Sequence, residues 1–365
     1  MDYRSRRKRI QELLSRNRLD ALLVTHLPNI RYLCGFTGSS AVLVLTEIRS
    51  VFVTDGRYIA QAKDEVKAVP ITIARQSPLL SAAEWLLESI QPSAGNRARN
   101  VGIEGEHMTV STRTKLSKKL GSRFTLKEAP PLIEQARTIK DAREIKLIRA
   151  AVQMGGNLFS TVLKNLRPGV TENAVSAELE YAARRAGAEQ MSFPAIIASG
   201  KRSALPHGRA SEAKIPAKGF VVCDFGVILA GYCSDMTRTI HMGSPTTKEK
   251  RAYEAVREAQ HAAIEAVKPG AGVGEVDGAA RKALKKHVLS RYFTHSTGHG
   301  VGLEIHESPR IAVNQNEVLQ PGMVITIEPG IYIPGKWGIR IEDMVLVTQT
   351  GCEVLTPVTK ELITL

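Results

Sequence analysis

Four carboxylates and one imidazole stand out because they lie in segments that otherwise look apolar and strand-forming: Asp224, Asp235, His299, Glu328 and Glu342. Buried like charges are unfavourable unless a cation or a proton neutralises them. Paired carboxylates with an imidazole suit two divalent ions that share a bridging water, and such ions lower the pKa of that water. The residue types therefore predict a dinuclear metal site that activates water.

A first hairpin would bring two of the carboxylates together. The apolar residues 220–227 lead into a short turn, and a second strand returns from residue 232. A turn centred between Leu229 and Ala230 places Asp224 opposite Asp235. Directly opposed residues have Cβ atoms about 5 Å apart, so two carboxylates there repel each other without a cation.

A second hairpin repeats this arrangement. Residues 323–333 and 338–348 read as its strands, and a turn centred at Gly335 places Glu328 opposite Glu342. A lone aspartate in a strand is more often an edge or turn residue, and a slip of one residue would turn a side chain to the other face. Two opposed pairs, together with a histidine between glycines, favour metal binding over that alternative.

Composition restricts the class of protein. A chain of 365 residues can hold two domains, and 43% hydrophobic with 24% charged residues is typical of a globular protein. No apolar stretch is long enough for a membrane span, and residues 1–9 are not followed by the apolar region of a signal peptide. The four cysteines have no metal or disulfide spacing, although Cys223 and Cys233 could face each other, and we expect a cytoplasmic protein.

The net charge of +14 raises the question of a nucleic-acid partner. Lysines and arginines are spread over predicted helices with acids between them, and the one dense basic run lies in residues 4–9. No aromatic-rich basic motif accompanies that run. We interpret it as a solvated helix face and predict neither a nucleic-acid nor a membrane partner.

The first part of the chain alternates between helix and strand patterns and predicts an α/β domain over residues 1–130. Helices are expected at 4–17, 58–65, 80–90 and 110–120, and strands at 21–25, 41–45, 50–54 and 101–104. The stretch from Lys127 to Pro131 breaks the pattern and marks the boundary to a second domain, 131–365.

The second domain contains a repeat. A long helix ends at Pro168-Gly169, a shorter helix follows, and then come a loop and the first hairpin. The same order recurs around Pro269-Gly270 and leads to the second hairpin. We infer a duplicated helix–helix–hairpin unit whose hairpins pool their carboxylates, with helices on one face of a curved, mainly antiparallel sheet and metals on the other. The fold class is α+β.

Five segments in this order resemble the pita-bread metallopeptidases, and within them the Xaa-Pro peptidases. The segments are DFG at 224–226, SDMTRT at 234–239, TGHGVGLEIHE at 297–307, IEPG at 327–330 and RIED at 340–343. GFTG at 35–38 and TDGRY at 54–58 resemble the N-terminal domain of that family, and FP at 193–194 resembles its substrate side. The resemblance covers nearly the whole chain.

The resemblance implies a role for each ligand. Asp224 and Asp235 would bind one metal, His299 the other, and Asp235 and Glu342 would bridge the two ions. Glu328 would be a ligand that also handles the proton of the attacking water. An oxygen-rich site with one imidazole favours Mn²⁺, and Co²⁺ and Zn²⁺ remain alternatives.

Further residues receive catalytic or substrate-binding roles from the same resemblance. His207, His295 and His306 would stabilise the tetrahedral intermediate, and His207 and His306 would also contact the substrate, since imidazole can donate a hydrogen bond or a proton near neutral pH. Arg340 would orient a carboxylate or a substrate terminus, with Tyr332 as its partner.

The expected activity is that of an Xaa-Pro aminopeptidase, in which a metal-bridging hydroxide attacks the peptide bond before a proline in the second position. One alternative is an Xaa-Pro dipeptidase (prolidase), which a basic group for the free carboxylate of proline would favour. A creatinase-like hydrolase and a catalytically silent pita-bread binding module are more remote, because no ligand is missing. The resemblance also implies a homodimer and a proline-containing peptide as substrate.

Overall fold

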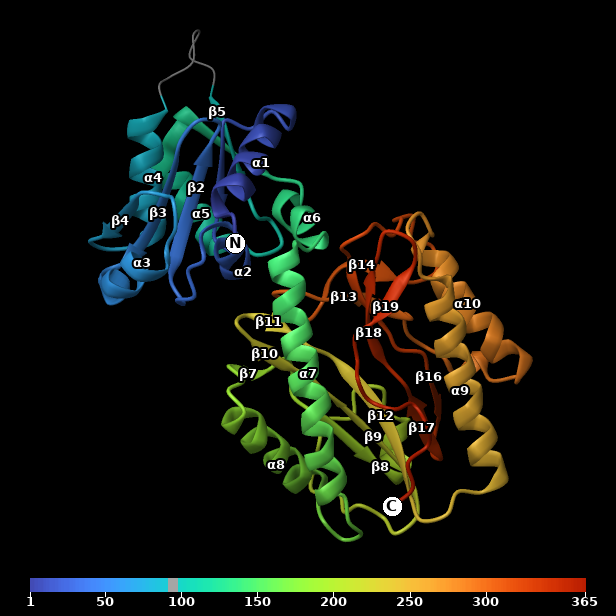
Figure 1. Ribbon diagram of the computed structural model, residues 1–365. Coiled ribbons are helices and arrows are strands. Elements are labelled where there is room, and N and C mark those ends of the chain that lie inside the picture. The colour runs from blue at the N-terminus through green and yellow to red at the C-terminus, as the bar shows by residue number, and fades with distance from the viewer. Residues whose placement is uncertain (91–97) are drawn as a thin grey trace. The chain divides into compact units, whose positions relative to one another are not determined.

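The computed structural model of the chain describes residues 1–90 and 98–365 and separates into an N-terminal unit, Met1–Arg137, and a C-terminal unit, Thr138–Leu365 (Figure 1). The division falls a few residues beyond our predicted boundary at residue 130, and the domain limit itself stays a prediction. None of the helices in the described ranges is long and apolar enough to cross a membrane.

A six-stranded mixed sheet with strand order β4-β3-β2-β1-β5-β6 forms the centre of the N-terminal unit. Its strands are β1 (Ala21–Val24), β2 (Ala41–Thr46), β3 (Ser50–Asp55), β4 (Ile71–Ala74), β5 (Arg99–Ile103) and β6 (Phe124–Glu128). The helices are α1 (Tyr3–Arg16), α2 (Leu27–Cys34), α3 (Ile59–Glu65), α4 (Pro78–Ser89), α5 (Val110–Leu120) and α6 (Leu132–Thr138).

The two edge strands of this sheet were not predicted. β6 contains Lys127 and Glu128, which we interpreted as part of a break. An edge strand has one neighbour and tolerates exposed polar residues, so its sequence lacks the apolar pattern of the central strands. The central strands β1 and β2 are buried throughout and agree with the predicted ranges.

The basic run in α1 is only partly a solvated face. Arg4 is exposed, but Arg6 and Arg7 are buried. Arg6 Nη1 donates to the carbonyl of Tyr32 at 3.1 Å, and Arg7 Nη1 donates to the carbonyl of Leu33 at 2.6 Å. These carbonyls lie in the last turn of α2, where helix geometry leaves acceptors without a partner and favours a positive charge. Two arginines of the run therefore cap a helix inside the unit.

The C-terminal unit confirms the duplicated order of elements. The first copy begins with α7 (Ala142–Asn165) and α8 (Glu172–Arg185), and the second begins with α9 (Thr247–Ala266) and α10 (Val273–Lys286). The glycines of the two Pro-Gly breaks have positive φ, 89° at Gly169 and 84° at Gly270. Glycine adopts this conformation without steric cost, so both breaks end their long helix in the same way.

Each pair of helices is followed by strands that make separate small sheets. The first copy contains β7 (Gln190–Met191), β8 (Ile196–Ser199), β9 (Gly219–Phe225), β10 (Val227–Leu229), β11 (Tyr232–Cys233) and β12 (Met236–Met242), in the orders β12-β9-β8 and β11-β10-β7. The second contains β13 (Gly298–Gly300), β14 (Glu307–Ile311), β15 (Val324–Ile327), β16 (Gly330–Ile333), β17 (Trp337–Arg340), β18 (Asp343–Val347) and β19 (Cys352–Val354), in the orders β14-β13-β15-β18-β19 and β16-β17.

The helices cover one face of these sheets. Cys223 and Phe225 of β9 pack in one apolar cluster with α7 and α8, while Ile325 and Ile327 of β15 pack in another with α9 and α10. Successive side chains of a strand point to opposite faces, so Asp224 points away from its helices. The carboxylates therefore lie on the face that the helices leave open, as predicted.

Hydrogen bonds join the two copies along β12. The amide of Arg340 donates to Thr239 Oγ1 at 3.0 Å, and that hydroxyl donates to the carbonyl of Arg340 at 2.8 Å. The amide of Glu342 donates to the carbonyl of Thr237 at 3.1 Å. The strand after Asp235 and the strand before Glu342 therefore run side by side, and this brings the ligands of the two hairpins together.

Candidate metal centre

The first hairpin has a different register from the one that we predicted. Its turn lies at Ala230 and Gly231, which have φ of 49° and 84°, and Asp224 pairs with Thr237. Two positive φ values are typical of a two-residue turn that matches the twist of the strands, and this turn moves the centre by one residue. The predicted pairing of Asp224 with Asp235 is therefore wrong. Because the pairing shifts by two positions, both carboxylates still lie on the same face.

The same register separates the two cysteines of this hairpin. Cys223 pairs with Arg238, and Cys233 pairs with Ile228. All four cysteines are free thiols. The suggestion that Cys223 and Cys233 face each other is therefore wrong.

The second hairpin has the predicted register. Ile327 pairs with Asp343 on one side of the carboxylates, and Gly330 pairs with Arg340 on the other. The same register on both sides places Glu328 and Glu342 opposite each other at the point where the strands are interrupted.

The imidazole of His299 reaches the cluster from a tightly packed strand. A Cβ atom on Gly298 would lie 1.9 Å from the carbonyl oxygen of Thr326, and one on Gly300 would lie 2.2 Å from that of Ser308. Only glycine permits this close approach on both sides of the histidine. His299 Nδ1 lies 3.0 Å from the carbonyl oxygen of Gly300 and can donate to it, which leaves the lone pair of Nε2 for a metal.

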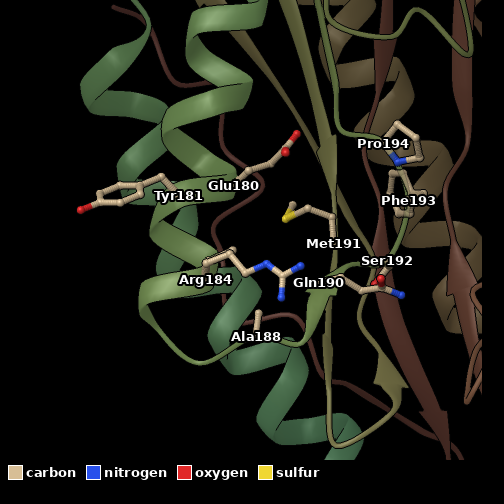
Figure 2. A pocket seen from close by; sticks show the side chains of 10 residues that line it. Glu180, Tyr181, Arg184, Ala188, Gln190, Met191, Ser192, Phe193 and Pro194 are labelled. Carbon is tan, nitrogen blue, oxygen red and sulfur yellow. The ribbon is translucent and has the colours of Figure 1, made fainter. Parts of the chain in front are cut away.

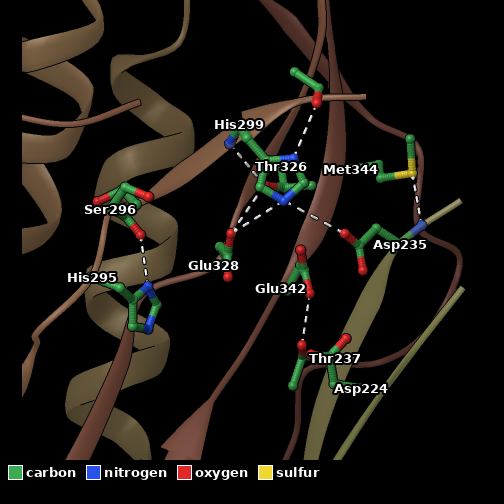
Figure 3. A network of polar contacts seen from close by, with 12 residues as sticks. Asp224, Asp235, Thr237, His295, Ser296, His299, Thr326, Glu328, Glu342 and Met344 are labelled. Atoms are coloured by element: carbon green, nitrogen blue, oxygen red, sulfur yellow. Dashed lines mark hydrogen bonds and ion pairs between the residues drawn. The ribbon is translucent and has the colours of Figure 1, made fainter. Parts of the chain in front are cut away.

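Four of the five predicted ligands converge on one place. Figure 3 shows the side chains of Asp235, Glu328 and Glu342 directed toward the ring of His299. His299 Nε2 lies 3.6 Å from Asp235 Oδ2 and 3.5 Å from Glu328 Oε1. Asp235, His299 and Glu342 each offer a ligand atom within 4.8 Å of the others. Such a group has the composition and size of a site for a divalent cation.

Asp224 completes the cluster from β9. Its Oδ2 accepts a hydrogen bond from Arg340 Nη2, whereas its Oδ1 is buried and has no hydrogen-bond partner among the described residues. A buried carboxylate oxygen without a donor is unfavourable unless a cation contacts it. The donor set therefore fits a bound divalent ion at Asp224.

Burial makes the cluster difficult to ionise without a cation. Burial, with the charges of Glu342 and Asp224, raises the pKa of Asp235, and burial with the charges of Glu328 and Asp224 raises the pKa of Glu342. Burial also raises the pKa of Glu328 to about 7. Like charges in one site cannot all ionise at neutral pH, so the cluster must hold protons or cations.

Arg340, Tyr332 and His295 form a chain of hydrogen bonds behind Asp224. Arg340 Nη1 donates to Tyr332 Oη at 2.6 Å, and Tyr332 Oη lies 2.9 Å from His295 Nε2. Burial lowers the pKa of His295 to about 4, so its ring is neutral at pH 7. His295 Nδ1 faces the carbonyl of Ser296 at 2.8 Å and is the donor there, which makes Nε2 the acceptor for the tyrosine hydroxyl.

These hydrogen bonds involve two residues that we predicted to bind the substrate. Arg340 and Tyr332 are buried, and the guanidinium also contacts Thr237 Oγ1 and the carbonyl of Pro206. These contacts are internal and orient Asp224. Substrate binding by Arg340 and Tyr332 stays a prediction, as does the catalytic role of His295.

His306 and His207 are exposed beside the cluster. The ring of His306 lies 4.4 Å from that of His299, edge to face. Partial burial, followed by the charges of His299 and His207, lowers the pKa of His306. The two histidines stand where a substrate could reach them, and their roles stay predictions.

The comparisons with known proteins cover the same residues. A sequence model of metallopeptidase family M24 matches residues 146–349, and one of the creatinase/prolidase N-terminal domain matches residues 6–139. This chain belongs to metallopeptidase family M24. An Xaa-Pro dipeptidase of Pyrococcus horikoshii is 38% identical, over 98% of either chain. The M24 chain is therefore a metallo-exopeptidase with the pita-bread fold of the Xaa-Pro peptidases.

Solved structures agree with this assignment of the M24 chain. A structure described as an Xaa-Pro dipeptidase from Bacillus anthracis is 40% identical with a TM-score of 0.94, and 100% of each chain is covered. An X-Pro aminopeptidase from Thermotoga maritima is 32% identical with a TM-score of 0.88, over 97% of this chain and 99% of that one. General metallopeptidase activity follows from family membership.

Sequence reasoning missed Arg310 in this M24 peptidase. In the register of β13 and β14, Arg310 pairs directly with His299, so the two side chains share one face. Arg310 is exposed, and no hydrogen bond or ion pair to its guanidinium is present within the described residues. The alternation of apolar and polar residues in 307–311 could have indicated a strand after the histidine motif. No turn residue indicated how this strand pairs with the strand of His299.

A groove of about 640 Å³ lies between α8 and β7 of the M24 peptidase (Figure 2). Tyr181 and Arg184 of α8 and Met191 of β7 line it, and so do Phe193 and Pro194. None of the candidate ligands or histidines contributes to this groove. The substrate-side role suggested for residues 193–194 stays a prediction.

Proposed function

We propose that this M24 metallopeptidase is an Xaa-Pro dipeptidase, which releases proline from dipeptides. Relatives from Pyrococcus horikoshii and Bacillus anthracis that carry this name support the proposal, at 38% and 40% identity. The observation that carries it is Arg310, an exposed cation without an ion-pair partner among residues 1–90 and 98–365, directly opposite the predicted ligand His299. A guanidinium can hold a carboxylate through two parallel hydrogen bonds, and in a dipeptide the free carboxylate of proline lies next to the scissile bond.

Two divalent ions would be held by Asp224, Asp235, His299, Glu328 and Glu342, and the oxygen-rich donor set favours Mn²⁺ over Co²⁺ or Zn²⁺. Bound there, they would supply Lewis acidity that lowers the pKa of water and polarises the scissile carbonyl.

The side chains around the metal ions would transfer protons, stabilise the intermediate and orient the ligands. Glu328, whose Oε1 lies 3.5 Å from His299 Nε2, would accept the proton of the attacking water and pass it to the proline nitrogen. His306 and His207 would donate hydrogen bonds to the oxygen that becomes negative in the tetrahedral intermediate. Arg340 would hold Asp224 in place while Tyr332 and His295 support the guanidinium.

The second candidate function is the Xaa-Pro aminopeptidase that we expected from the sequence. The Thermotoga maritima structure of that name, at 32% identity, favours it. The two activities differ in the group attached to the proline carbonyl, since a dipeptide ends there in a carboxylate and a longer peptide continues as a neutral chain. Homodimer formation and a cytoplasmic location remain predictions of the same kind.

The deciding experiment compares Ala-Pro with Ala-Pro-Ala and longer peptides, using chelator-stripped protein with and without Mn²⁺. A dipeptidase cleaves only the dipeptide. Its Arg310→Met variant should lose about 10²-fold or more in kcat/KM through KM, since a charged hydrogen bond is lost, while its metal content is unchanged. Arg257→Met is the matched control, because that arginine pairs with Glu254 and Glu361 at the surface. Faster cleavage of longer peptides, or no effect of Arg310→Met, would favour the aminopeptidase.

A further inference from the structure

The loop that carries His306 is closed at its base. Gly300 and Glu307 pair with each other in the β13–β14 ladder, and residues 301–306 form an excursion between them. The amide of Gly302 donates to the carbonyl of Glu304 at 3.0 Å within the loop. His306 is the last residue of this excursion, and its ring lies 4.4 Å from that of His299. The position of His306 therefore depends on the shape of the loop.

A carboxylate occupies the inside of that loop. The side chain of Glu307 is 6% exposed, and its Oε1 accepts a hydrogen bond from the amide of Glu304 at 3.2 Å. A Cβ atom on Gly302 would lie 2.5 Å from Glu307 Oε2. The loop is thus folded directly around the carboxylate, and a side chain at position 302 would displace it.

Lys140 neutralises this carboxylate from the start of the C-terminal unit. Lys140 Nζ lies 3.1 Å from Glu307 Oε2, and its side chain is 1% exposed. The amide of Lys140 donates to the carbonyl of Gly322 at 2.9 Å, which fixes the lysine to the second copy. A buried ion pair is seldom more stabilising than well-packed apolar residues of the same volume, so stability alone does not account for it.

The outer side of the loop is bonded to the first hairpin. The amide of Cys233 donates to the carbonyl of Gly302 at 2.8 Å, and Cys233 precedes the ligand Asp235 by two residues. The loop is therefore held from inside by Glu307 and from outside by the strand that presents a metal ligand. A change in the contacts of Glu307 would therefore affect both the position of His306 and the strand that contains Cys233.

We propose that the buried Lys140–Glu307 ion pair is a positioning device, which fixes residues 301–306 and so holds His306 beside His299 and the substrate. Neither Lys140 nor Glu307 contacts the reacting atoms, and both act through His306. The inference rests on the proposed function only where it concerns catalysis. The fixing of the loop is independent of the substrate.

The first test is hydrogen exchange of the metal-loaded enzyme, followed by mass spectrometry. Glu307→Gln keeps the shape of the side chain but leaves the buried lysine without its counter-charge. We expect peptides that contain residues 300–307 and the Cys233 amide to exchange about tenfold faster or more, because the loop opens more often. Glu353→Gln is the matched control, since Glu353 forms an exposed ion pair with Arg149. Unchanged exchange in Glu307→Gln would overturn the proposal.

A second variant guards against loss of folding. Lys140→Met combined with Glu307→Gln has no unpaired buried charge, so this double variant retains its fold even where Glu307→Gln alone does not. Its loop should still exchange faster than in the wild type, because the ionic contact is absent. Wild-type exchange rates in the folded double variant would show that packing alone fixes the loop, and would overturn the proposal.

The kinetic test uses His306 as its reference. Glu307→Gln should lower kcat/KM for an Xaa-Pro dipeptide about tenfold or more in the wild type, but less than about twofold in a His306→Ala background. Equal losses in both backgrounds would contradict action through His306. If the wild-type enzyme cleaves no Xaa-Pro peptide, the proposed function fails, and the exchange experiment still decides whether the ion pair fixes the loop.

Discussion

Arg340 and Asp224 form an ion pair inside the candidate metal centre, in which the guanidinium occupies one oxygen of the carboxylate and the other has no hydrogen bond from any residue that the structure describes. Both side chains are at most 10% exposed. The arginine therefore orients a predicted metal ligand and leaves its second oxygen available to a cation. Substitution of Arg340, of a predicted metal ligand or of a residue hydrogen-bonded to Arg340 should change metal affinity, stability or both.

Replacement of Arg340 by methionine should weaken Mn²⁺ binding about 10- to 100-fold, which is the usual effect of removing a partner that orients a ligand. Asp224 would lose its donor and its fixed rotamer. Isothermal titration of the metal-free protein measures the affinity. Arg257→Met serves as the surface control, and an unchanged Mn²⁺ affinity in Arg340→Met would show that Asp224 does not depend on this contact.

Glu342→Gln should remove metal-dependent turnover and stabilise the metal-free protein at pH 8. The pKa of Glu342 is raised by burial and by the charges of Glu328 and Asp224, so a neutral side chain of the same shape relieves repulsion. Thermal unfolding with a chelator present measures the stability, and metal analysis measures the lost ion. A variant that binds Mn²⁺ and turns over normally would contradict the ligand assignment.

The metal-free protein should lose stability as the pH rises. Glu328 has a raised pKa of about 7 against a usual value of 4.5, so the folded protein binds more protons than the unfolded chain between these values. Its contribution is therefore complete below pH 4.5 and is lost as the pH increases through 7. Urea unfolding from pH 5 to 8 measures this slope, which added Mn²⁺ should remove. A Glu328→Gln protein should lack the Glu328 part of the slope.

Tyr332→Phe should destabilise the protein by about 1–3 kcal/mol, because two buried groups lose the hydroxyl that lies between them. Arg340 Nη1 would keep the carbonyl of Pro206, while His295 Nε2 would have no donor. Urea unfolding of the metal-loaded protein gives the difference. Tyr181→Phe on the exposed face of α8 is the control, and equal stability of the two variants would argue against a role for the chain of hydrogen bonds.

Much of this site could be predicted from sequence, because alternation in a strand and residue type carry most of the information. Glu328 and Glu342 were paired correctly since the Pro-Gly turn between their strands has an evident centre. Asp224 and Asp235 were assigned to the right face but were wrongly paired with each other. The turn was misplaced because Ala230 adopts a positive φ, which is unusual for alanine.

Other features needed the fold itself. The pairing of Arg310 with His299 depends on how β14 returns past the irregular loop 301–306, and sequence spacing does not determine the register across such a loop. The ion pair of Lys140 with Glu307 joins residues that are far apart in the sequence, and neither residue has a local pattern that indicates its burial. Edge strands such as β6 were missed because they are only half buried.

The two helix–helix–hairpin copies each contribute two of the four carboxylates. A gene that encoded one copy could have assembled the full cluster only by dimerisation of its product, with one hairpin from each subunit. Fusion of two copies removes that dependence on protein concentration, and afterwards the two halves are free to diverge. His299 comes from the second copy and both aspartates come from the first, so the two halves now bring different residue types to the cluster.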